Sequence, residues 1–169
     1  MSEREQKYKS QIDAAKDNIL EARQRGEQIV YTGGTFDLLH YGHARFLRTC
    51  GKIGYTIVGL NTDEFIEEYK GRPPVMAYDE RREILLGLTS VMEVVPNIGG
   101  ADSKPAILAI NPDYVVIGDD WAKKDYYAQM QFTQEWLDEN DITLLYTPYT
   151  QGISTTEIKA RLAKYEKKD

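Results

Sequence analysis

The hydrophobic and polar positions of this chain change their period near residue 28. Upstream of it, apolar residues recur every three or four positions in a strongly polar segment that ends at Gly26, as expected of one amphipathic helix. The apolar stripe consists of Tyr8, Ile12, Ala15, Ile19 and Ala22. We expect residues 1–27 to form a helical extension that packs on its own domain, with a contact between two copies of the chain as the alternative.

From residue 28 onward, short apolar runs alternate with helical patterns. The runs predict strands over 29–32, 56–60, 91–95, 114–117 and 142–146, and the helical patterns predict helices over 42–53, 79–88, 104–110, 131–139 and 154–165. Asp79 is the expected N-cap of its helix, and a proline lies in the first turn of the next one. This alternation predicts an α/β fold over residues 28–169: a Rossmann-like, doubly wound parallel sheet of about five strands in a three-layer α/β/α arrangement.

Composition narrows the classes of protein that remain. The chain has 169 residues, of which 41% are hydrophobic and 28% charged, as in an ordinary globular domain. No apolar run approaches the length that crosses a bilayer, and the charged start does not resemble a signal peptide, so we expect a cytoplasmic protein with no membrane contact. Cys50 is the only cysteine, so the chain has no internal disulfide and no thiolate zinc site, and we expect Cys50 to be buried.

The formal net charge of -6 argues against binding of nucleic acid, because proteins that bind it usually carry a basic stripe and this sequence has no long basic block. An acidic chain can still bind a small polyanion by gathering a few cations and backbone amides in one cleft. In a doubly wound sheet, that cleft lies beyond the carboxyl ends of the strands.

The segment after the first predicted strand has parts that suit a phosphate site. It lacks both the lysine–serine pair of a P-loop and the spacing of dinucleotide-binding glycines. However, Gly33 and Gly34 allow the backbone to approach a ligand closely, and a helix that begins near Gly42 points free N–H groups at that ligand.

His40 and His43 are the only histidines, and they flank Gly42, which we expect to leave room for the substrate. A spacing of three across a helix start can place both rings on one side. Their N–H groups then suit the charge that develops on an α-phosphate and its leaving oxygen during in-line displacement. The alternative is that each ring only completes a structural hydrogen bond.

These residues carry a family resemblance. Residues 34–43, with the sequence GTFDLLHYGH, resemble the signature of the cytidylyltransferase family, whose HxGH part is shared with adenylyltransferases and, loosely, with class I aminoacyl-tRNA synthetases. Residues 61–65, 118–121 and 152–156 are similar to segments of the bacterial glycerol-3-phosphate cytidylyltransferases. The likeness spans roughly residues 28–162.

The resemblance implies ten nucleotide-binding positions: Gly34, Thr35, Phe36, Gly42, Asp120, Trp121, Thr150, Gly152, Ser154 and Thr155. Of these, Asp120 and Trp121 are expected to contact the cytosine and the ribose. The resemblance also implies that Lys70 is catalytic together with the two histidines. We expect Lys70 and Arg72 on a mobile loop that folds over the triphosphate.

Several of these roles have structural alternatives. Ser154 and the two threonines after it open the last predicted helix, so their hydroxyls either cap that helix or bind a β- or γ-phosphate. A cap is likewise the alternative for Asp119 or Asp120. Asp37 is expected to orient a neighbouring backbone group or a histidine, and we assign no residue as a metal ligand.

The sequence departs from the glycerol-phosphate enzymes at two positions, where Tyr149 and Thr89 stand in place of common arginines. A tyrosine can donate one hydrogen bond but has no charge, so Tyr149 cannot replace a bidentate arginine. Lys123 or Lys124 is the candidate to compensate. We group Tyr149 with Asp37 and Arg72 as residues for the acceptor or a phosphate.

The resemblance therefore implies transfer of CMP from CTP to a small phosphorylated alcohol, similar to glycerol 3-phosphate, with release of pyrophosphate. Mg²⁺ is the implied cofactor, because it bridges triphosphate oxygens in such reactions. The alternatives are an adenylyltransferase that acts on a sugar phosphate or a related acceptor, and a non-catalytic nucleotide-binding domain. The family also implies a possible homodimer.

Overall fold

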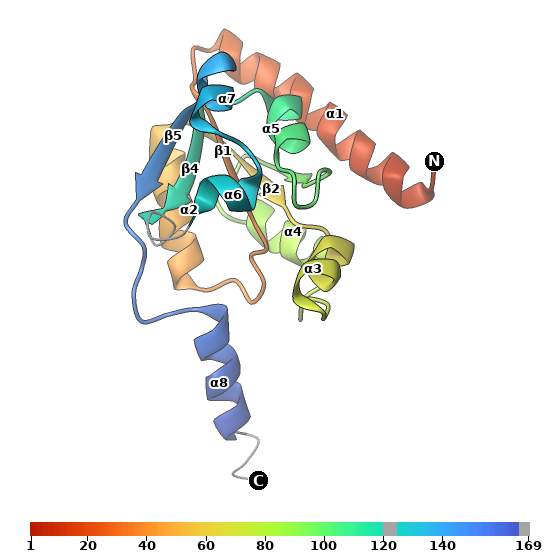
Figure 1. Cartoon of the computed structure of the whole chain (residues 1–169), viewed down its shortest axis with the longest axis vertical. Coiled ribbons are helices and arrows are strands. Elements are labelled where there is room, and N and C mark those ends of the chain that lie inside the picture. Colours follow the sequence, from red (N-terminus) through yellow and green to blue (C-terminus); the bar gives the residue numbers. More distant parts are fainter. Residues whose placement is uncertain (120–124, 166–169) are drawn as a thin grey trace.

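One parallel sheet organises the computed structural model, which describes residues 1–119 and 125–165 (Figure 1). Its strands are β1 (Ile29–Gly34), β2 (Tyr55–Leu60), β3 (Glu93–Pro96), β4 (Tyr114–Gly118) and β5 (Thr143–Thr147). They lie in the order β3-β2-β1-β4-β5, and every pairing is parallel. The predicted doubly wound sheet is therefore confirmed, with its change of direction between β1 and β4.

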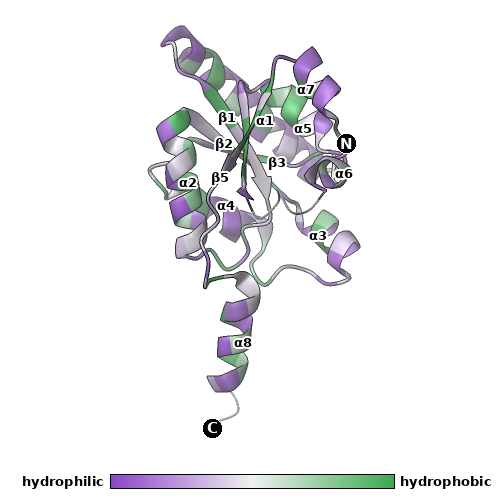
Figure 2. Cartoon of the chain, turned by 60° about the vertical axis from the view of Figure 1, so that its left-hand side comes forward, coloured by the Kyte–Doolittle hydropathy of each residue, from purple (hydrophilic) through white to green (hydrophobic). Residues whose placement is uncertain are grey.

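Helices cover both faces of this sheet (Figures 1 and 2). They are α1 (Glu3–Gln24), α2 (Tyr41–Ile53), α3 (Asp63–Lys70), α4 (Tyr78–Leu86), α5 (Lys104–Ile110), α6 (Tyr126–Met130), α7 (Gln134–Glu139) and α8 (Thr155–Tyr165). Alternate residues of a strand point to opposite faces, so Ile29 and Tyr31 pack with α1 and α5 while Val30 packs with Cys50 of α2. Cys50 is buried, as predicted.

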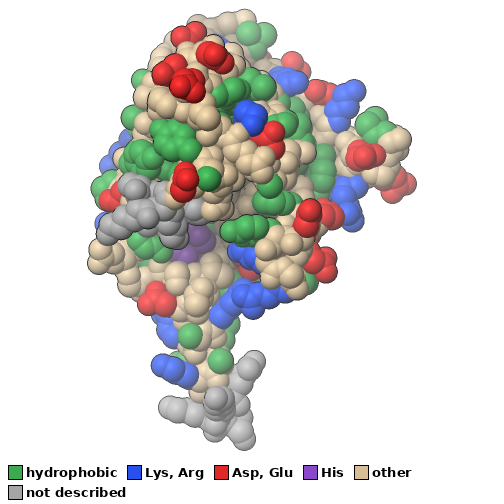
Figure 3. Space-filling model, viewed as in Figure 1, with side chains coloured by type: hydrophobic (Ala, Val, Ile, Leu, Met, Phe, Trp, Pro, Cys, Tyr) green, Lys and Arg blue, Asp and Glu red, His purple; other side chains and the backbone are tan. Residues whose placement is uncertain are grey.

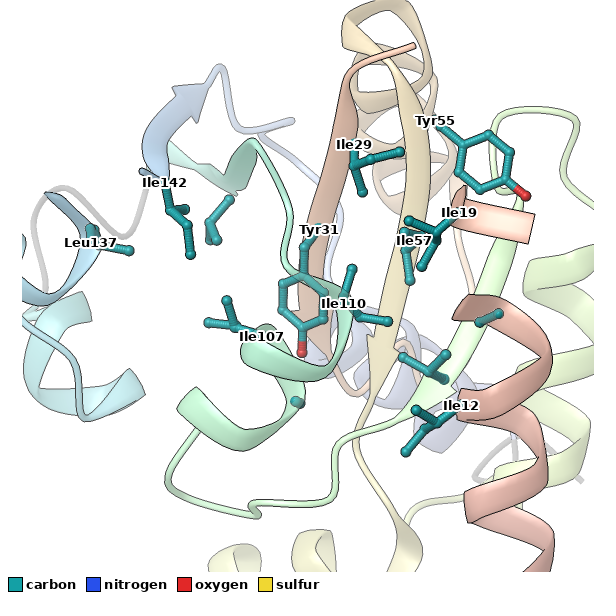
Figure 4. Close-up of a cluster of buried hydrophobic side chains, with 14 of the residues drawn as sticks. Ile12, Ile19, Ile29, Tyr31, Tyr55, Ile57, Ile107, Ile110, Leu137 and Ile142 are labelled. Carbon is teal, nitrogen blue, oxygen red and sulfur yellow. The ribbon is translucent and has the colours of Figure 1, made fainter. Parts of the chain in front are cut away.

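The larger of the hydrophobic clusters lies on the α1 and α5 face and is drawn in Figure 4. Helix α1 contributes Ile12, Ala15, Ile19 and Ala22 of its apolar stripe to this cluster, whereas Tyr8 packs against the cluster on α4 and the end of β2. Its first half also contacts α4, since Lys7 binds Asp79 at 2.6 Å. Residues 1–27 thus share one core with the sheet. Within the part of the chain that the structure describes, no helix is long and apolar enough to cross a membrane.

Three predicted elements are placed differently in the structure. The helix predicted over 79–88 is α4, and Ala77, not Asp79, is its N-cap residue, because the Glu80 carboxylate accepts the Ala77 N–H at 2.7 Å. The strand predicted over 91–95 is β3, which begins two residues later. The helix predicted over 131–139 is α7, which begins three residues later because Thr133 is its N-cap, and α6 before it was not predicted.

Helix α3 was not predicted. Thr62 caps its start by accepting the Phe65 N–H, and Gly71 ends it in a left-handed conformation with φ +68°. Lys70 is therefore the last residue of a helix, so its predicted place on a mobile loop was wrong. A helix end holds the base of this side chain, and the residue as a whole is exposed.

The last helix, α8, projects from the body of the molecule (Figures 1 and 2). No residue between its bounds is buried. It is joined to the domain at its first turn, where the Thr155 hydroxyl donates to the Asp37 carbonyl at 2.9 Å. The N-terminus of α8 consequently lies beside the loop that follows β1.

Strands β1 and β4 separate towards their carboxyl ends. Their pairing covers only Val30 with Tyr114 and Tyr31 with Val115, whereas β1 pairs with β2 along its whole length. The ends of β1 and β4 are consequently free to border a ligand. This opening lies at the reversal of strand order, where doubly wound sheets bind their ligands.

Candidate active site

A cavity of about 540 Å³ occupies the opening between β1 and β4. Its walls come from the ends of β1, β2 and β4, from α2 and α3, and from the start of α8. Predicted site residues along it are Gly34, Thr35, Phe36, His40, Gly42, His43, Lys70, Tyr149, Thr150, Ser154 and Thr155. A recess of about 220 Å³, lined by Asp37 and Arg72, shares His43 and Lys70 with this cavity. In the space-filling view, histidine lies in a hollow above α8, with Lys and Arg side chains beside it (Figure 3).

The two histidines are held by the start of α2. His40 is its N-cap residue, and the ring Nδ1 of His40 accepts the Gly42 N–H at 3.1 Å. In return, Nδ1 of His43 accepts the His40 N–H at 3.4 Å. The pair thus forms a reciprocal capping box made of imidazoles. As a result the rings stack, with centroids 3.8 Å apart and planes 20° from parallel.

These hydrogen bonds determine the protonation of both rings. An Nδ1 that accepts a hydrogen bond carries no proton, so a neutral ring bears its proton on Nε2. Burial lowers the pKa of His40 below its usual value. Burial, together with the neighbouring His40, lowers the pKa of His43 to about 4. At neutral pH both rings are therefore uncharged donors through Nε2, with no competing positive charge between them.

Close packing leaves these rings little freedom. A methyl group on Gly42 would lie 3.0 Å from the His40 ring and 3.0 Å from Ile153. Gly42 therefore leaves room for the His40 ring, and it also lines the cavity, where its predicted role in leaving room for the substrate stays a prediction. Gly34 has a similar role, because a methyl group there would lie 2.9 Å from the Phe36 ring. Phe36 in turn packs edge-on against His43, with ring centroids 5.2 Å apart.

The loop between β1 and α2 is strained. Phe36 and Leu38 have φ angles of 50° and 49°, in the left-handed region that side chains disfavour. The Asp37 carboxylate accepts the N–H groups of Val75 and Met76, each at 3.0 Å. Asp37 therefore orients a neighbouring backbone, as predicted, and joins this loop to the segment before α4. Strained backbone of this kind persists where the surrounding contacts fix it, often at functional sites.

Lys70 and Arg72 supply positive charge at the other wall. Burial lowers the pKa of Lys70, and the nearby cation of Lys159 lowers it further, while the Asp37 carboxylate opposes both effects. Lys70 lines the cavity and the recess, whereas Arg72 lines the recess alone. The structure therefore brings the three predicted catalytic residues, His40, His43 and Lys70, to one cavity.

The hydroxyl groups before α8 have structural partners. Ser154 accepts the Glu157 N–H at 3.1 Å, so it caps the helix while it also lines the cavity. Tyr149 donates from its hydroxyl to the Ile153 carbonyl at 3.3 Å, and its N–H donates to Asp119 at 2.8 Å. Asp119 therefore orders the loop after β5.

Some predicted residues are not placed along the cavity, for two different reasons. Asp120, Trp121, Lys123 and Lys124 lie outside the described residues. Gly152 is described but lines neither the cavity nor the recess, because it occupies a turn with φ +77°. Its predicted contact with a nucleotide stays a prediction, and its conformation accounts for the glycine.

Sequence reasoning missed Arg81, which is buried beneath the site. Its guanidinium group donates to the carbonyls of Thr35 at 2.7 Å and Asn61 at 2.9 Å, and to the Asp63 carboxylate at 2.6 Å. It also donates to the Met76 carbonyl at 2.9 Å. Arg81 thus joins the ends of β1 and β2 to α3. A charged residue on the otherwise apolar face of α4 was the signal that pointed to this role.

Residues 1–119 and 125–165 contain no group of three or more histidine, cysteine or carboxylate side chains that could hold a metal ion. Among the described residues, the donor set at the recess is cationic and neutral apart from Asp37, whose oxygens face backbone N–H groups.

Known protein families and proteins resemble this chain over most of its length. The model of the cytidylyltransferase-like family matches residues 31–161. The chain is 37% identical over 135 residues to the glycerol-3-phosphate cytidylyltransferase of Bacillus subtilis (strain 168), covering 79% of this chain and 96% of that protein. It is 35% identical over 150 residues to the bifunctional protein HldE of Actinobacillus pleuropneumoniae serotype 5b (strain L20), covering 86% of this chain and 30% of that protein.

Two solved structures share the fold. The lipopolysaccharide core biosynthesis protein of Thermoplasma volcanium GSS1 is 23% identical with a TM-score of 0.61, over 74% of this chain and 99% of that one. The pantothenate synthetase of Thermus thermophilus is 13% identical with a TM-score of 0.53, over 84% of this chain and 68% of that one. At these identities, the likeness concerns the fold alone.

Proposed function

Since this chain belongs to the cytidylyltransferase-like family and is a nucleotidyltransferase, we propose that it transfers CMP from CTP to a small phosphorylated alcohol similar to glycerol 3-phosphate. The observation that carries the proposal is the stacked pair of neutral imidazoles at the opening between β1 and β4. Support for the acceptor comes from the relatives named glycerol-3-phosphate cytidylyltransferase, at 37% and 39% identity.

The reaction needs no covalent enzyme intermediate. An oxygen of the acceptor's phosphate attacks the α-phosphorus of CTP, the bond from that phosphorus to the bridging oxygen breaks, and pyrophosphate leaves with the electron pair. A phosphate is already ionised near neutral pH, so the attacking group needs no strong general base. This agrees with two histidines whose lowered pKa values keep them as donors.

His40 and His43 act on the charge that builds up during displacement. Donors fixed before the reaction, and aimed at the position where charge develops, lower the barrier because they do not have to reorganise. Both imidazoles meet this condition, since each Nδ1 is bonded to backbone and each Nε2–H is left as a donor. Lys70 adds positive charge from the end of α3.

We also propose that Mg²⁺ enters with the triphosphate and neutralises part of its charge. Asp37 is not its ligand in this proposal, because both carboxylate oxygens accept backbone hydrogen bonds. The groups that would hold the triphosphate together with its Mg²⁺ are Lys70, Thr155 and the backbone at the start of α8.

A panel of substrates tests the proposal. Pyrophosphate release is measured with each of CTP, ATP, GTP and UTP, with and without Mg²⁺, against glycerol 3-phosphate, a hexose 1-phosphate and no acceptor. We expect release only when CTP, Mg²⁺ and a phosphorylated acceptor are present together. Turnover with ATP alone among the nucleotides would overturn the choice of CTP in favour of an adenylyltransferase, and the absence of release from every mixture would overturn nucleotidyl transfer.

A further inference from the structure

The recess beside the histidines is unusual for an acidic protein, because cations dominate its walls. Lys70, Arg72 and Lys159 line it, and Asp37 is the one carboxylate among its described lining residues. The formal net charge of the whole chain is -6. Positive charge that is gathered in one recess of an acidic protein attracts small anions to that recess.

Asp37 offsets the charge of these cations only in part, since it is one carboxylate against Lys70, Arg72 and Lys159. Its oxygens accept the N–H groups of Val75 and Met76 at 3.0 Å, and Lys159 approaches one of them only to 3.7 Å. Lys159 thus stays within Coulomb range of Asp37 without a short hydrogen bond to it. Its side chain keeps 33% of its exposure, so the ammonium group remains able to bind a further anion.

The position of Lys159 on α8 relates it to the site. It lies four residues after Thr155, so the two side chains project from the same face of the helix. Thr155 lines both the cavity and the recess, and its hydroxyl is bonded to the loop after β1. Lys159 therefore faces the recess from a helix that is otherwise exposed. The pKa of Lys70 is also lowered by Lys159, after the larger effect of burial, as expected of cations that share a site.

We propose that Lys159 is a phosphate-binding residue of the transfer reaction, and that it supplies the positive charge that Tyr149 lacks. The inference rests on the proposed function and adds a residue to it. The bound group is a phosphate, which belongs either to the pyrophosphate end of the nucleotide or to the acceptor. In both cases the third cation of the recess, after Lys70 and Arg72, comes from α8.

The first experiment measures binding without turnover. Pyrophosphate with Mg²⁺ is titrated calorimetrically into the full-length chain and into Lys159→Ala, with Lys164→Ala as the matched control, because Lys164 lies on the same helix, is exposed and lines neither pocket. We expect Lys159→Ala to bind pyrophosphate or glycerol 3-phosphate, tested separately, about 10-fold to 100-fold more weakly, as for loss of a charge-assisted hydrogen bond. Unchanged affinity for both ligands would overturn the inference.

The two ligands identify the source of the phosphate. Weaker binding of pyrophosphate assigns Lys159 to the nucleotide, with a matching rise in KM for CTP. Weaker binding of glycerol 3-phosphate assigns it to the acceptor. Because binding is measured directly, a wild-type protein that binds but does not turn over would contradict the proposed function and leave the role of Lys159 standing.

A second variant tests the exchange of cations. Tyr149→Arg is introduced into Lys159→Ala, and we expect it to restore at least half of the lost affinity on a logarithmic scale. No restoration would overturn the claim that Lys159 replaces the family's arginine. A purely structural role through Asp37 predicts something else: a lower melting temperature for Lys159→Ala, with unchanged ligand affinity of the folded protein, and that result also overturns the inference.

Discussion

The two walls of the site are built in opposite ways. On the α2 wall, the imidazoles of His40 and His43 are fixed by backbone hydrogen bonds and close packing. On the facing wall, Lys70 and Arg72 are exposed side chains that stand at and just beyond the end of a short helix. We therefore expect the α2 wall to keep its geometry without a ligand and the cationic wall to be ordered by a bound anion.

This difference separates two functions of the site. Fixed donors aimed at the reacting phosphorus contribute to the rate of the chemical step. Exposed cations contribute mainly to the affinity for the triphosphate, and they lose conformational entropy when they bind it. Variants on the α2 wall should therefore lower kcat, and variants on the cationic wall should raise KM.

The largest effect is expected from His43→Asn. The asparagine Oδ1 can still accept the His40 N–H, but no donor remains at the position of Nε2. We expect kcat to fall about 100-fold to 1,000-fold, the usual loss for one such donor, with little change in KM for CTP. Steady-state kinetics measure this, and a melting temperature close to that of the wild type shows that the fold is kept. An unimpaired kcat would remove His43 from the chemistry.

Gly42→Ala tests whether ring position matters as much as ring identity. The added methyl group would lie 3.0 Å from both the His40 ring and Ile153, so the ring has to move. We expect kcat to fall roughly 10-fold, as for about 1.4 kcal/mol of misplacement. Gly26→Ala is the control, since its methyl group meets nothing within 4 Å and its φ of 78° makes it costly for stability alone. If Gly42→Ala keeps full kcat, as the control is expected to do, the α2 wall is not as rigid as inferred.

Arg72→Ala tests the cationic wall of the site. The loss of one exposed cation is expected to raise KM for CTP about fivefold and to leave kcat within about twofold. Added salt should raise the wild-type KM more than that of the variant, because screening acts on the charge that the variant lacks. Kinetics in about 50 mM and about 500 mM KCl, on either side of physiological ionic strength, provide the test. A fall in kcat without a change in KM would contradict the division between the walls.

The smallest effect concerns pH. The pKa of His43 is about 4 in the folded chain, against an ordinary value near 6.5. Between these values the unfolded chain binds more protons than the folded one, so the free energy of unfolding falls as the pH decreases from about 6.5 to about 4. His43→Asn should show a shallower decrease, measured by urea unfolding at several pH values. Identical slopes for the two proteins would mean that His43 is not buried as a neutral ring.

The sequence predicted the sheet well because buried parallel strands have a simple signature. The apolar run of β1 and the strands after it were located by hydrophobicity alone, and the histidines were located by the motif at the end of β1. The resemblance added Lys70, which hydrophobic periodicity cannot identify. All three residues line the cavity.

The errors have two physical causes: one helix is short, and other roles depend on contacts that the local sequence does not contain. Helix α3 was missed because it has only 8 residues, although Thr62 and Gly71 at its ends are local signals of a helix start and stop. The space around Gly42 is occupied by Ile153, which comes from a distant part of the chain. Arg81 likewise gains its role from partners on other elements, and Lys159 meets Asp37 from the far end of the chain.

Transfer of labelled CMP is the most direct test of the proposed chemistry. The wild type and a His40→Asn, His43→Asn double variant are incubated with CTP labelled at the α-phosphate, Mg²⁺ and glycerol 3-phosphate, and the products are separated. We predict that the label moves to a CMP–acceptor conjugate in the wild type, with one pyrophosphate released per conjugate, and that the double variant forms essentially none. Label that remains in CTP or is released as free CMP in the wild type, or equal transfer by the double variant, would contradict catalysis by the two stacked imidazoles.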